Sequence, residues 1–392
     1  MNKVYIVSAV RTPFGSFGGV FKNLSAVDLG AAAIKGGLEK ANVNPNNVDE
    51  VFMGNVVSAN IGQAPARQAA LKAGISNTVP CTTVNKVCSS GMKATMFGAQ
   101  SIMLGLKDIV VVGGMESMSN IPYYSPDTRW GRKYGDSKLI DGLAKDGLTD
   151  AYGKMPMGVC ADATASKFDV SREAQDEFSI NSYKRVATAT ENGDFSNEIV
   201  PVNVPQRRGD DLVITEDEEY KKVKFEKIPS LRAVFTKEGT VTAANASTIN
   251  DGASVLVLAS ESAVKKHGLK PVGEIVAFGD AAHAPEWFTT APPKAAKKAL
   301  EMAGLDISDM DYFEINEAFA VVSMVFAQEF GISYDKMNVF GGAVALGHPL
   351  GASGARIVTT LNSVLHNKDG KYGLAAICNG GGGASAMIIK RI

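Results

Sequence analysis

Residues 341–356 read GGAVALGHPLGASGAR and residues 378–384 read CNGGGGA. These two segments contain one histidine, one cysteine and several glycines, at turns that follow apolar, strand-like runs. Because glycine has no side chain, a substrate can approach the peptide N–H groups of such turns closely. A developing oxyanion requires donors of that kind. The two segments therefore predict an α/β layer with a reactive site at its strand ends.

A third segment, residues 85–91, reads NKVCSSG and places Cys88 between an apolar run and an Ala-rich helical run. A cysteine at a helix N-terminus meets unpaired N–H groups and the positive end of the helix dipole, which lower the pKa of its thiol. We therefore predict that Cys88 is a nucleophile. From this segment alone, a buried and inert cysteine is the alternative, because cysteine is among the most buried residue types.

His348 lies between Gly347 and Pro349 in a tight loop, which is more elaborate than a core histidine requires. It is predicted to serve as the base for a cysteine, with a structural histidine as the alternative. Cys378 ends an expected strand just before Gly380, whose N–H group is expected at the same site. A second thiol there is suited to giving and taking a proton, unless it is only a strand-end cysteine. With Cys88, these residues predict acyl-transfer chemistry.

Asn316 begins the segment NEAF, residues 316–319, which joins an expected strand to an expected helix. Its side chain either orients a water molecule or an oxyanion, or it is simply the N-cap of the helix. A lysine cluster in residues 221–227 is either a solvated charged surface or a phosphate-binding site.

The composition excludes several classes of function. With 40 basic and 41 acidic residues in 392, the net charge of −1 gives no field that would attract nucleic acid or an anionic membrane. No apolar run is long enough to span a membrane. Four cysteines in so long a chain are too few for a disulfide scaffold and form no CxxC pair for a metal. We expect a cytoplasmic enzyme, or a mitochondrial one if a leader precedes this sequence.

Apolar runs alternate with helical runs in both halves of the chain, which indicates two related α/β domains. Strands are expected at Lys3–Ala9, Val51–Val57, Thr82–Val87, Ile109–Val112, Val272–Gly279, Met310–Ile315, Val339–Val344 and Gly373–Cys378. Helices are expected at Ser25–Ala41, Gln63–Ala73, Gly91–Gly105, Pro292–Ala303, Ala318–Phe330 and Gly351–His366. The polar segment between the halves is expected to fold over the site.

These motifs, in this order, resemble those of the thiolase family, and the resemblance runs from Val4 to Ile392. It implies a thiolase fold, in which two related βαβ-type domains form five layers, α-β-α-β-α, with an inserted loop domain. The implied N-terminal thiolase domain comprises residues 1–117 and 243–271. Residues 118–242 form the implied loop domain over a CoA site, and residues 272–392 the C-terminal domain.

The resemblance also implies a reaction, the reversible Claisen condensation of two acetyl-CoA molecules to acetoacetyl-CoA and CoA, feeding mevalonate, sterol or ketone metabolism. Cys88, activated by His348, would carry the acetyl group, and Cys378 would take a proton from the second acetyl-CoA. His348 and a water molecule on Asn316 would hold the enolate oxygen, while the N–H groups of Cys88 and Gly380 would hold the tetrahedral oxyanion. The alternatives are a broad-chain 3-ketoacyl-CoA thiolase of fatty-acid β-oxidation and a non-catalytic CoA- or lipid-binding protein of this fold.

The same resemblance implies the ligand contacts. No cofactor is required, because CoA is substrate and product. The implied CoA contacts are Tyr183, Lys222, Val223, Lys224, Lys227, Ser247, Leu148, Met157, Phe235 and Phe319. A potassium ion is possible at Tyr183, Ala243, Ala244, Ala246 and Val344.

Relatives in this family are usually dimers or tetramers, and a homotetramer joined through a loop like residues 120–138 is expected here. Two departures from relatives are visible. Pro156 replaces a histidine found in many bacterial members, so any role of that histidine in the pocket is absent. Phe288-Thr289 stands where the enzyme that accepts 2-methyl-branched substrates has Phe-Pro, so we predict poor activity on such substrates.

Overall fold

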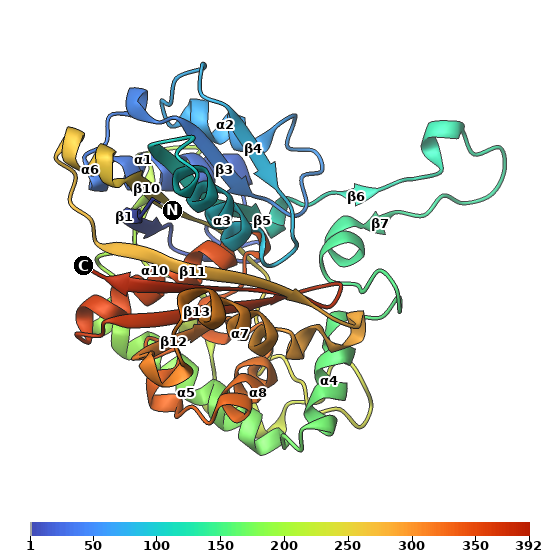
Figure 1. Ribbon diagram of the computed structural model, residues 1–392. Helices are drawn as coiled ribbons and strands as arrows, with labels where there is room; N and C mark the ends of the chain where they lie inside the picture. Colours follow the sequence, from blue (N-terminus) through green and yellow to red (C-terminus); the bar gives the residue numbers. More distant parts are fainter. Residues whose placement is uncertain (1) are drawn as a thin grey trace.

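The computed structural model describes residues 2–392 and is built around one ten-stranded mixed sheet (Figure 1). Its strands, in spatial order, are β12 (Tyr312–Ile315), β13 (Tyr372–Asn379), β14 (Gly383–Arg391), β11 (Gly273–Ala282), β1 (Val4–Arg11), β10 (Asn250–Ser260), β5 (Ile109–Ser117), β3 (Glu50–Gly54) and β4 (Cys81–Val84), with β2 (Gly15–Ser16) beside β10. The central strands β5 and β10 are buried at every residue, as expected for apolar runs covered on both faces.

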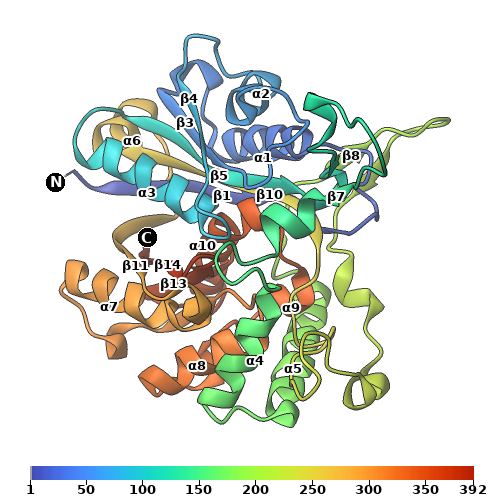
Figure 2. The same cartoon turned by 90° about the vertical axis from the view of Figure 1, so that its right-hand side faces the viewer.

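The sheet has two halves, which we call the N-half sheet (β4, β3, β5, β10 and β1) and the C-half sheet (β11, β14, β13 and β12). Within residues 2–392, three antiparallel residue pairs between β1 and β11 connect the two halves of the sheet. Both halves pack against the same two helices, α3 (Ser90–Met103) and α10 (Leu350–Asn367), and one apolar cluster draws on both helices and on strands of both halves. Figures 1 and 2 show these two helices between the halves.

The outer face of each half-sheet is covered by further helices. The N-half sheet carries α1 (Ala26–Ala41), α2 (Pro65–Lys72) and α6 (Glu261–His267), and the C-half sheet carries α7 (Pro292–Ala303) and α8 (Ala320–Phe330). Helix α1 begins where the sequence predicts, because Ser25 and Asp28 form a reciprocal capping box. The layers are thus helix, sheet, helix, sheet, helix, as expected. None of the helices described in residues 2–392 is long and apolar enough to cross a membrane.

One expected strand is wrong. Residues 339–342 form no strand, and Val344 lies in the short helix α9 (Ala343–Leu346). The reason is the buried carboxylate of Glu317, which accepts the N–H of Val344 at 3.1 Å. Gly341, with φ of +81°, turns the chain toward that acceptor. An anion at the start of a helix stabilises the helix.

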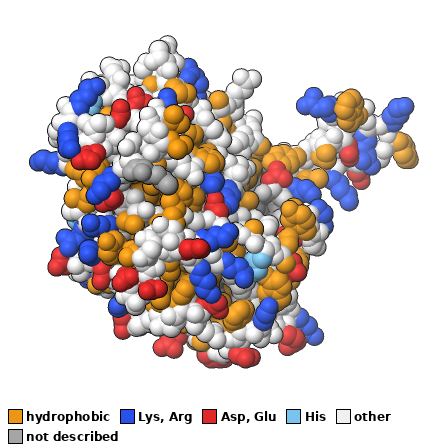
Figure 3. Space-filling model, in the orientation of Figure 1, with side chains coloured by type: hydrophobic (Ala, Val, Ile, Leu, Met, Phe, Trp, Pro, Cys, Tyr) orange, Lys and Arg blue, Asp and Glu red, His pale blue; other side chains and the backbone are white. Residues whose placement is uncertain are grey.

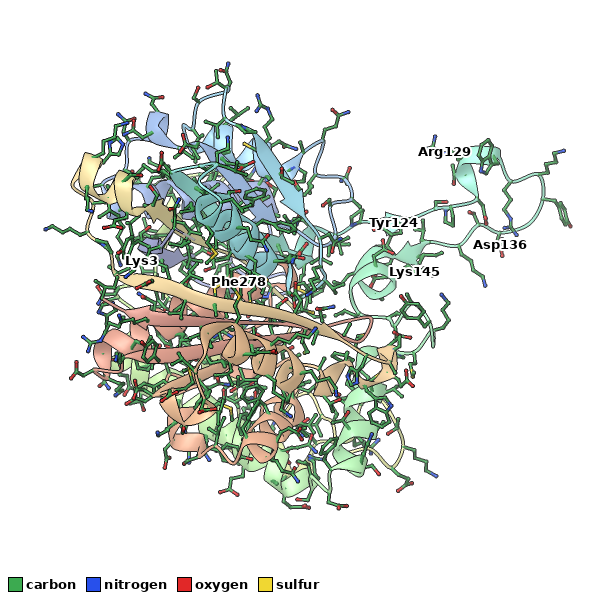
Figure 4. All side chains as sticks on the ribbon, in the orientation of Figure 1. Lys3, Tyr124, Arg129, Asp136, Lys145 and Phe278 are labelled. Atoms are coloured by element: carbon green, nitrogen blue, oxygen red, sulfur yellow. The ribbon has the colours of Figure 1, made fainter. Side chains whose placement is uncertain are left out.

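The segment inserted between β5 and β10 packs mainly on the C-half side. It contains α4 (Met157–Lys167), α5 (Arg172–Glu191), β8 (Val202–Val204) and β9 (Leu212–Ile214), and α5 contacts α8 and α9. Residues 121–141, which we call the arm, extend away from the body with the short strands β6 (Tyr123–Tyr124) and β7 (Ile140–Asp141) (Figures 1 and 4). Its tip is a mixture of basic and apolar side chains (Figure 3), with Trp130 88% and Tyr134 95% exposed.

Close packing between β5 and α10 predicts a large effect of Gly114→Ala. A Cβ atom at Gly114 would overlap the carbonyl oxygen of Gly351 at the start of α10. Backbone cannot move aside as a flexible side chain can, so we expect a loss of about 3 kcal/mol or more in the free energy of unfolding by urea. The control is Gly37→Ala in α1, where the new methyl group would meet ordinary contacts and a gain of about 0.5–1 kcal/mol is expected. Equal stability of the two variants would contradict this packing.

Candidate active site

Cys88, His348 and Gly380 line one cavity of about 390 Å³. They come from three segments that are distant in the sequence: the turn before α3, the loop before α10 and the turn after β13. The rest of the wall is mostly apolar. Among the predicted CoA contacts, the wall includes Leu148, Met157, Phe235, Ser247 and Phe319.

The turn that carries Cys88 is strained and held from several sides. Val87 has φ of +49°, an uncommon conformation for a β-branched residue that persists only when its surroundings enforce it. Its N–H donates to Oδ1 of Asn85 at 3.0 Å, and its carbonyl accepts from the hydroxyl of Ser90 at 2.6 Å. The same hydroxyl accepts the N–H of Lys86 at 2.8 Å. These bonds fix Cys88 at the start of α3, as the sequence predicts.

The predicted low pKa of the Cys88 thiol is wrong. Burial raises the pKa of Cys88 to about 12, and the N–H groups of Gly380 and of Cys88 itself only partly oppose this rise. Desolvation of the thiolate outweighs these two N–H bonds, because burial disfavours whichever form is charged. Burial also raises the pKa of Cys378 far above its ordinary value, with the Cys88 sulfur as the next cause. Both groups are therefore thiols in this structure, and they lie close enough to influence each other.

The loop of His348 fixes both the position and the protonation of its ring. The His348 N–H donates to Oδ1 of Asn250 at 3.0 Å. The hydroxyl of Ser353 donates to the carbonyl oxygen of Pro349 at 2.9 Å, and its oxygen lies 2.6 Å from Nδ1 of His348. With that hydrogen donated to Pro349, the Ser353 oxygen accepts from Nδ1, and in this tautomer Nε2 carries no proton. Within residues 2–392, Nε2 has no hydrogen-bond partner, so it is free to act as a base.

Electrostatics keep this imidazole neutral. Burial, followed by the positive charge of Arg356, lowers the pKa of His348 to about 3. A neutral thiol on Cys88 thus faces a neutral base on His348, and the proton transfer between them waits for a substrate to stabilise the resulting charge.

Cys378 and Asn316 are buried next to this cavity and do not line it. Cys378 lies in β13, and Asn316 follows β12 on the parallel neighbour, where its N–H donates to the carbonyl of Ala376 at 3.0 Å. Asn316 is not the N-cap of α8, since that position is Phe319. Its Nδ2 atom is buried without a hydrogen-bond partner among the described residues, as is Nε2 of His348.

A second cavity of about 470 Å³ shares Phe235, Ala246 and Ser247 with the first and extends past Lys222. The two cavities adjoin at these shared residues, and we call them together the channel. Lys222 is half exposed and pairs with Glu218 at 3.0 Å. Of the other predicted CoA contacts, Lys224 and Lys227 are exposed but line neither cavity, and Tyr183 and Val223 belong to an apolar cluster beside the channel.

The residues predicted for potassium are brought together in part. Tyr183 and Val344 share that apolar cluster. Ala243 and Ala246 line the channel, and the carbonyl oxygens of Ala243, Ala244 and Ala246 accept no hydrogen bond from the described residues. Free carbonyl oxygens suit a hard cation, so these residues fit a potassium ion. No cluster of three or more His, Cys, Asp or Glu that could hold a metal occurs in residues 2–392.

Two residues at this site were not found from the sequence. Ser353 sets the tautomer of His348, but in GASGAR it is indistinguishable from any small helical residue. Glu116 is fully buried and accepts the N–H groups of Val56 at 2.9 Å and Gly351 at 2.8 Å, and burial raises the pKa of Glu116 to about 7. The sequence does contain a signal for Glu116, because it is a charged residue inside the otherwise apolar run VVVGGMES.

Known proteins match this chain along its whole length, including all the segments that form the site. The family model described as thiolase, N-terminal domain, matches residues 4–262, and that described as thiolase, C-terminal domain, matches residues 269–391. An acetyl-CoA acetyltransferase of Schizosaccharomyces pombe is 57% identical over 392 residues, which covers 100% of this chain and 99% of the relative. The cytosolic acetyl-CoA acetyltransferase ERG10 of Gibberella zeae is 54% identical over 390 residues, which covers 99% of this chain and 98% of the relative. Among solved structures, the Acat5 thiolase of Ascaris suum in complex with coenzyme A has a TM-score of 0.94 and 46% identity, with 100% of both chains covered.

Proposed function

This chain belongs to the thiolase family and has the thiolase fold, and from this premise we propose that it is an acetyl-CoA acetyltransferase. It joins two molecules of acetyl-CoA into acetoacetyl-CoA and free CoA, and runs the same reaction in reverse. The observation that carries the proposal is the single cavity in which Cys88 meets an unprotonated Nε2 of His348 and the N–H of Gly380.

In the first half-reaction, Nε2 of His348 takes the proton of the Cys88 thiol, and the thiolate attacks the carbonyl carbon of acetyl-CoA. The N–H groups of Cys88 and Gly380 stabilise the oxyanion of the tetrahedral intermediate, and the loss of one such donor typically costs about 3–4 kcal/mol of barrier. The C–S bond to CoA then breaks, and the Cys378 thiol gives its proton to the departing CoA sulfur. The result is an acetyl group on Cys88 and a thiolate on Cys378.

In the second half-reaction, the Cys378 thiolate removes a proton from the methyl group of the second acetyl-CoA. Nε2 of His348, now protonated, and a water molecule on Nδ2 of Asn316 hold the enolate oxygen. The carbanion attacks the acetyl carbon on Cys88, and the released thiolate recovers its proton from His348. Burial makes the Cys378 thiolate a strong base, because its pKa is high.

The test of this function is thiolysis of acetoacetyl-CoA by CoA, followed as loss of the absorbance of the magnesium enolate. Rapid turnover with acetoacetyl-CoA and slow turnover along a series of longer 3-ketoacyl-CoA substrates is the expected result. Preference for longer chains would favour the broad-chain thiolase, and no turnover by folded protein would favour a non-catalytic CoA- or lipid-binding protein. The similarity to the two acetyl-CoA acetyltransferases named above supports the acetyl-specific enzyme.

Lys222 is expected to hold a CoA phosphate at the mouth of the channel. Lys222→Ala should raise KM for CoA by about three- to tenfold and leave kcat nearly unchanged, because a half-exposed charged contact is worth about 1 kcal/mol. Lys221→Ala is the matched control, since Lys221 pairs with Glu216 and lines neither cavity. Equal effects of the two substitutions on KM in steady-state kinetics would show that net charge alone matters.

Branched substrates are expected to be poor. Phe288 lines the cavity, and the buried Thr289 is fixed by a 2.6 Å bond to Thr164, so this wall has little freedom to move away from an added methyl group. We predict kcat/KM for 2-methylacetoacetyl-CoA on the order of 10- to 100-fold below that for acetoacetyl-CoA. Efficient cleavage of the branched substrate in the same assay would refute this.

The assembly and the cation are further parts of the proposal. The exposed Trp130 and Tyr134 of the arm suit contact with a second copy of the chain, and a homotetramer, measured by light scattering, is the expected state. Potassium at Tyr183 and the free carbonyl oxygens of Ala243, Ala244 and Ala246 should increase turnover relative to sodium. No other cofactor is required, and a cytoplasmic location is proposed from the similarity to the cytosolic relative.

A further inference from the structure

Arg356 is a fully buried cation close to the site, and the reaction as proposed gives it no role. It lies on α10, about two helical turns beyond His348. Its guanidinium donates from Nη1 to Oε1 of Glu314 at 2.5 Å and from Nη2 to Oδ1 of Asn316 at 3.4 Å. Glu314 and Asn316 are two positions apart at the end of β12, so their side chains lie on the same side of the strand. One planar group thus reaches both.

The chemistry of this contact fixes the orientation of the Asn316 amide. A guanidinium has only N–H donors, so the amide must present its oxygen to Arg356. The nitrogen, Nδ2, is then directed away from Arg356, and it is buried without a hydrogen-bond partner among the described residues. If the amide turned over, its NH₂ group would meet donors on Arg356 and the oxygen would replace the nitrogen as the free group. Without Arg356, both orientations become available.

We propose that Arg356 is a positioning residue for the condensation step, because it holds Asn316 with Nδ2 as the free donor. This inference rests on the proposed function, in which Nδ2 binds the water molecule that stabilises the enolate oxygen. The positive charge of Arg356 acts on the second enolate donor as well, since it helps to keep the pKa of His348 low. A protonated Nε2 of low pKa is a strong hydrogen-bond donor to a developing oxyanion.

The alternative is a purely structural role, in which Arg356 only neutralises the buried carboxyl group of Glu314. Burial raises the pKa of Glu314 to about 8 despite Arg356, and Oε2 of Glu314 has no partner among the described residues, so this pair is incompletely satisfied. Replacement of an incompletely satisfied ion pair by neutral groups need not destabilise a protein. The two roles therefore predict different results when Glu314 and Asn316 are substituted separately.

The experiment compares Arg356→Lys, Glu314→Gln and the double variant Arg356→Met/Glu314→Met, each with and without Asn316→Ala. Lysine keeps the charge, but its single ammonium group lacks the fork that spans both acceptors. Removing both charges avoids an unpaired buried carboxylate, so at least one variant without Arg356 should fold. Thermal unfolding identifies the folded variants. Each folded variant is assayed for acetylation of Cys88 by labelled acetyl-CoA and for kcat and KM in thiolysis.

We expect Arg356→Lys and the double methionine variant to lower kcat on the order of 10- to 100-fold, with Cys88 acetylation and KM nearly unchanged. In the Asn316→Ala background Arg356→Lys, which keeps the positive charge near His348, should cost less than about twofold more, because it acts through Asn316. Glu314→Gln should change kcat much less. Full multiplication of the Arg356 and Asn316 effects, or an equal loss of acetylation, overturns the inference. Wild-type protein that neither acetylates Cys88 nor turns over would instead refute the proposed function.

Discussion

Cys88→Ser is expected to lower kcat for thiolysis of acetoacetyl-CoA on the order of 10⁴- to 10⁶-fold, the scale seen when a covalent nucleophile is removed from a catalytic unit. The hydroxyl replaces the thiol at nearly the same place, so the strained turn at Val87 and its bonds to Ser90 should persist. What changes is the acidity of the attacking group. The pKa of His348 is lowered to about 3, so it can accept the proton of a thiol only when a bound substrate stabilises the charge. It is too weak a base to accept the proton of the less acidic serine hydroxyl.

The measurement combines steady-state thiolysis with mass spectrometry after exposure to acetyl-CoA. Wild-type protein should gain one acetyl group on the peptide that contains Cys88, and the serine variant none. Cys81→Ser is the matched control, because Cys81 lies outside the cavity and its thiol donates to the carbonyl of Val79. Rates within about twofold of wild type are expected for it. A Cys88→Ser enzyme with a tenth of the normal rate would assign the nucleophile to another residue.

The sequence predicted those site residues that lie in segments rich in glycine. Cys88, His348 and Gly380 lie in such segments, and the structure brings all three to one cavity. Glycine at these turns indicates that the backbone must be accessible there, and this signal is local, so it does not depend on knowledge of the tertiary structure. The roles assigned to these residues stay predictions until the substitutions are measured.

The protonation of the site could not be read in the same way. A helix N-terminus is visible in the sequence and predicts a low pKa for Cys88, whereas the burial that raises its pKa to about 12 depends on the tertiary structure. The hydrogen-bond partners of Ser353 and Arg356 could not be predicted from the sequence for the same reason. Arg356 meets Asn316 only because α10 packs across the end of β12, and no local pattern records that contact.

The fold shows the same division between local and distant causes. Apolar runs predicted most strands and the helical spacing after Ser25 predicted the start of α1, because these signals are local. The strand expected at Val339–Val344 failed because the carboxylate of Glu317, a distant residue, starts a helix there. Arg11 is a further example. It is fully buried between Glu198 at 2.6 Å and Asp217 at 2.7 Å, and both partners are remote in the sequence.

Cys378→Ala is the prediction with the second largest effect, and it should separate the two half-reactions. Cys378 is fully buried, and only its sulfur is lost, so the end of β13 should keep its pairing with β14. Acetylation of Cys88 should still go to completion, although more slowly, because water or buffer can protonate the departing CoA. Condensation and thiolysis should fall on the order of 10²- to 10⁴-fold, the usual contribution of a positioned general base.

Exchange of the acetyl-CoA methyl protons with deuterated solvent gives the decisive readout, because it reports proton removal without the C–C bond step. The wild-type enzyme should catalyse this exchange, while Cys378→Ala should acetylate Cys88 and yet leave the methyl protons in place. Cys160→Ala is the control, since Cys160 is a buried cysteine of the same apolar cluster as Cys378 but lies on α4 and not at the end of β13. Exchange at the wild-type rate in Cys378→Ala would move the role of base to His348. That result would leave the raised pKa of Cys378 a consequence of burial without a part in the chemistry.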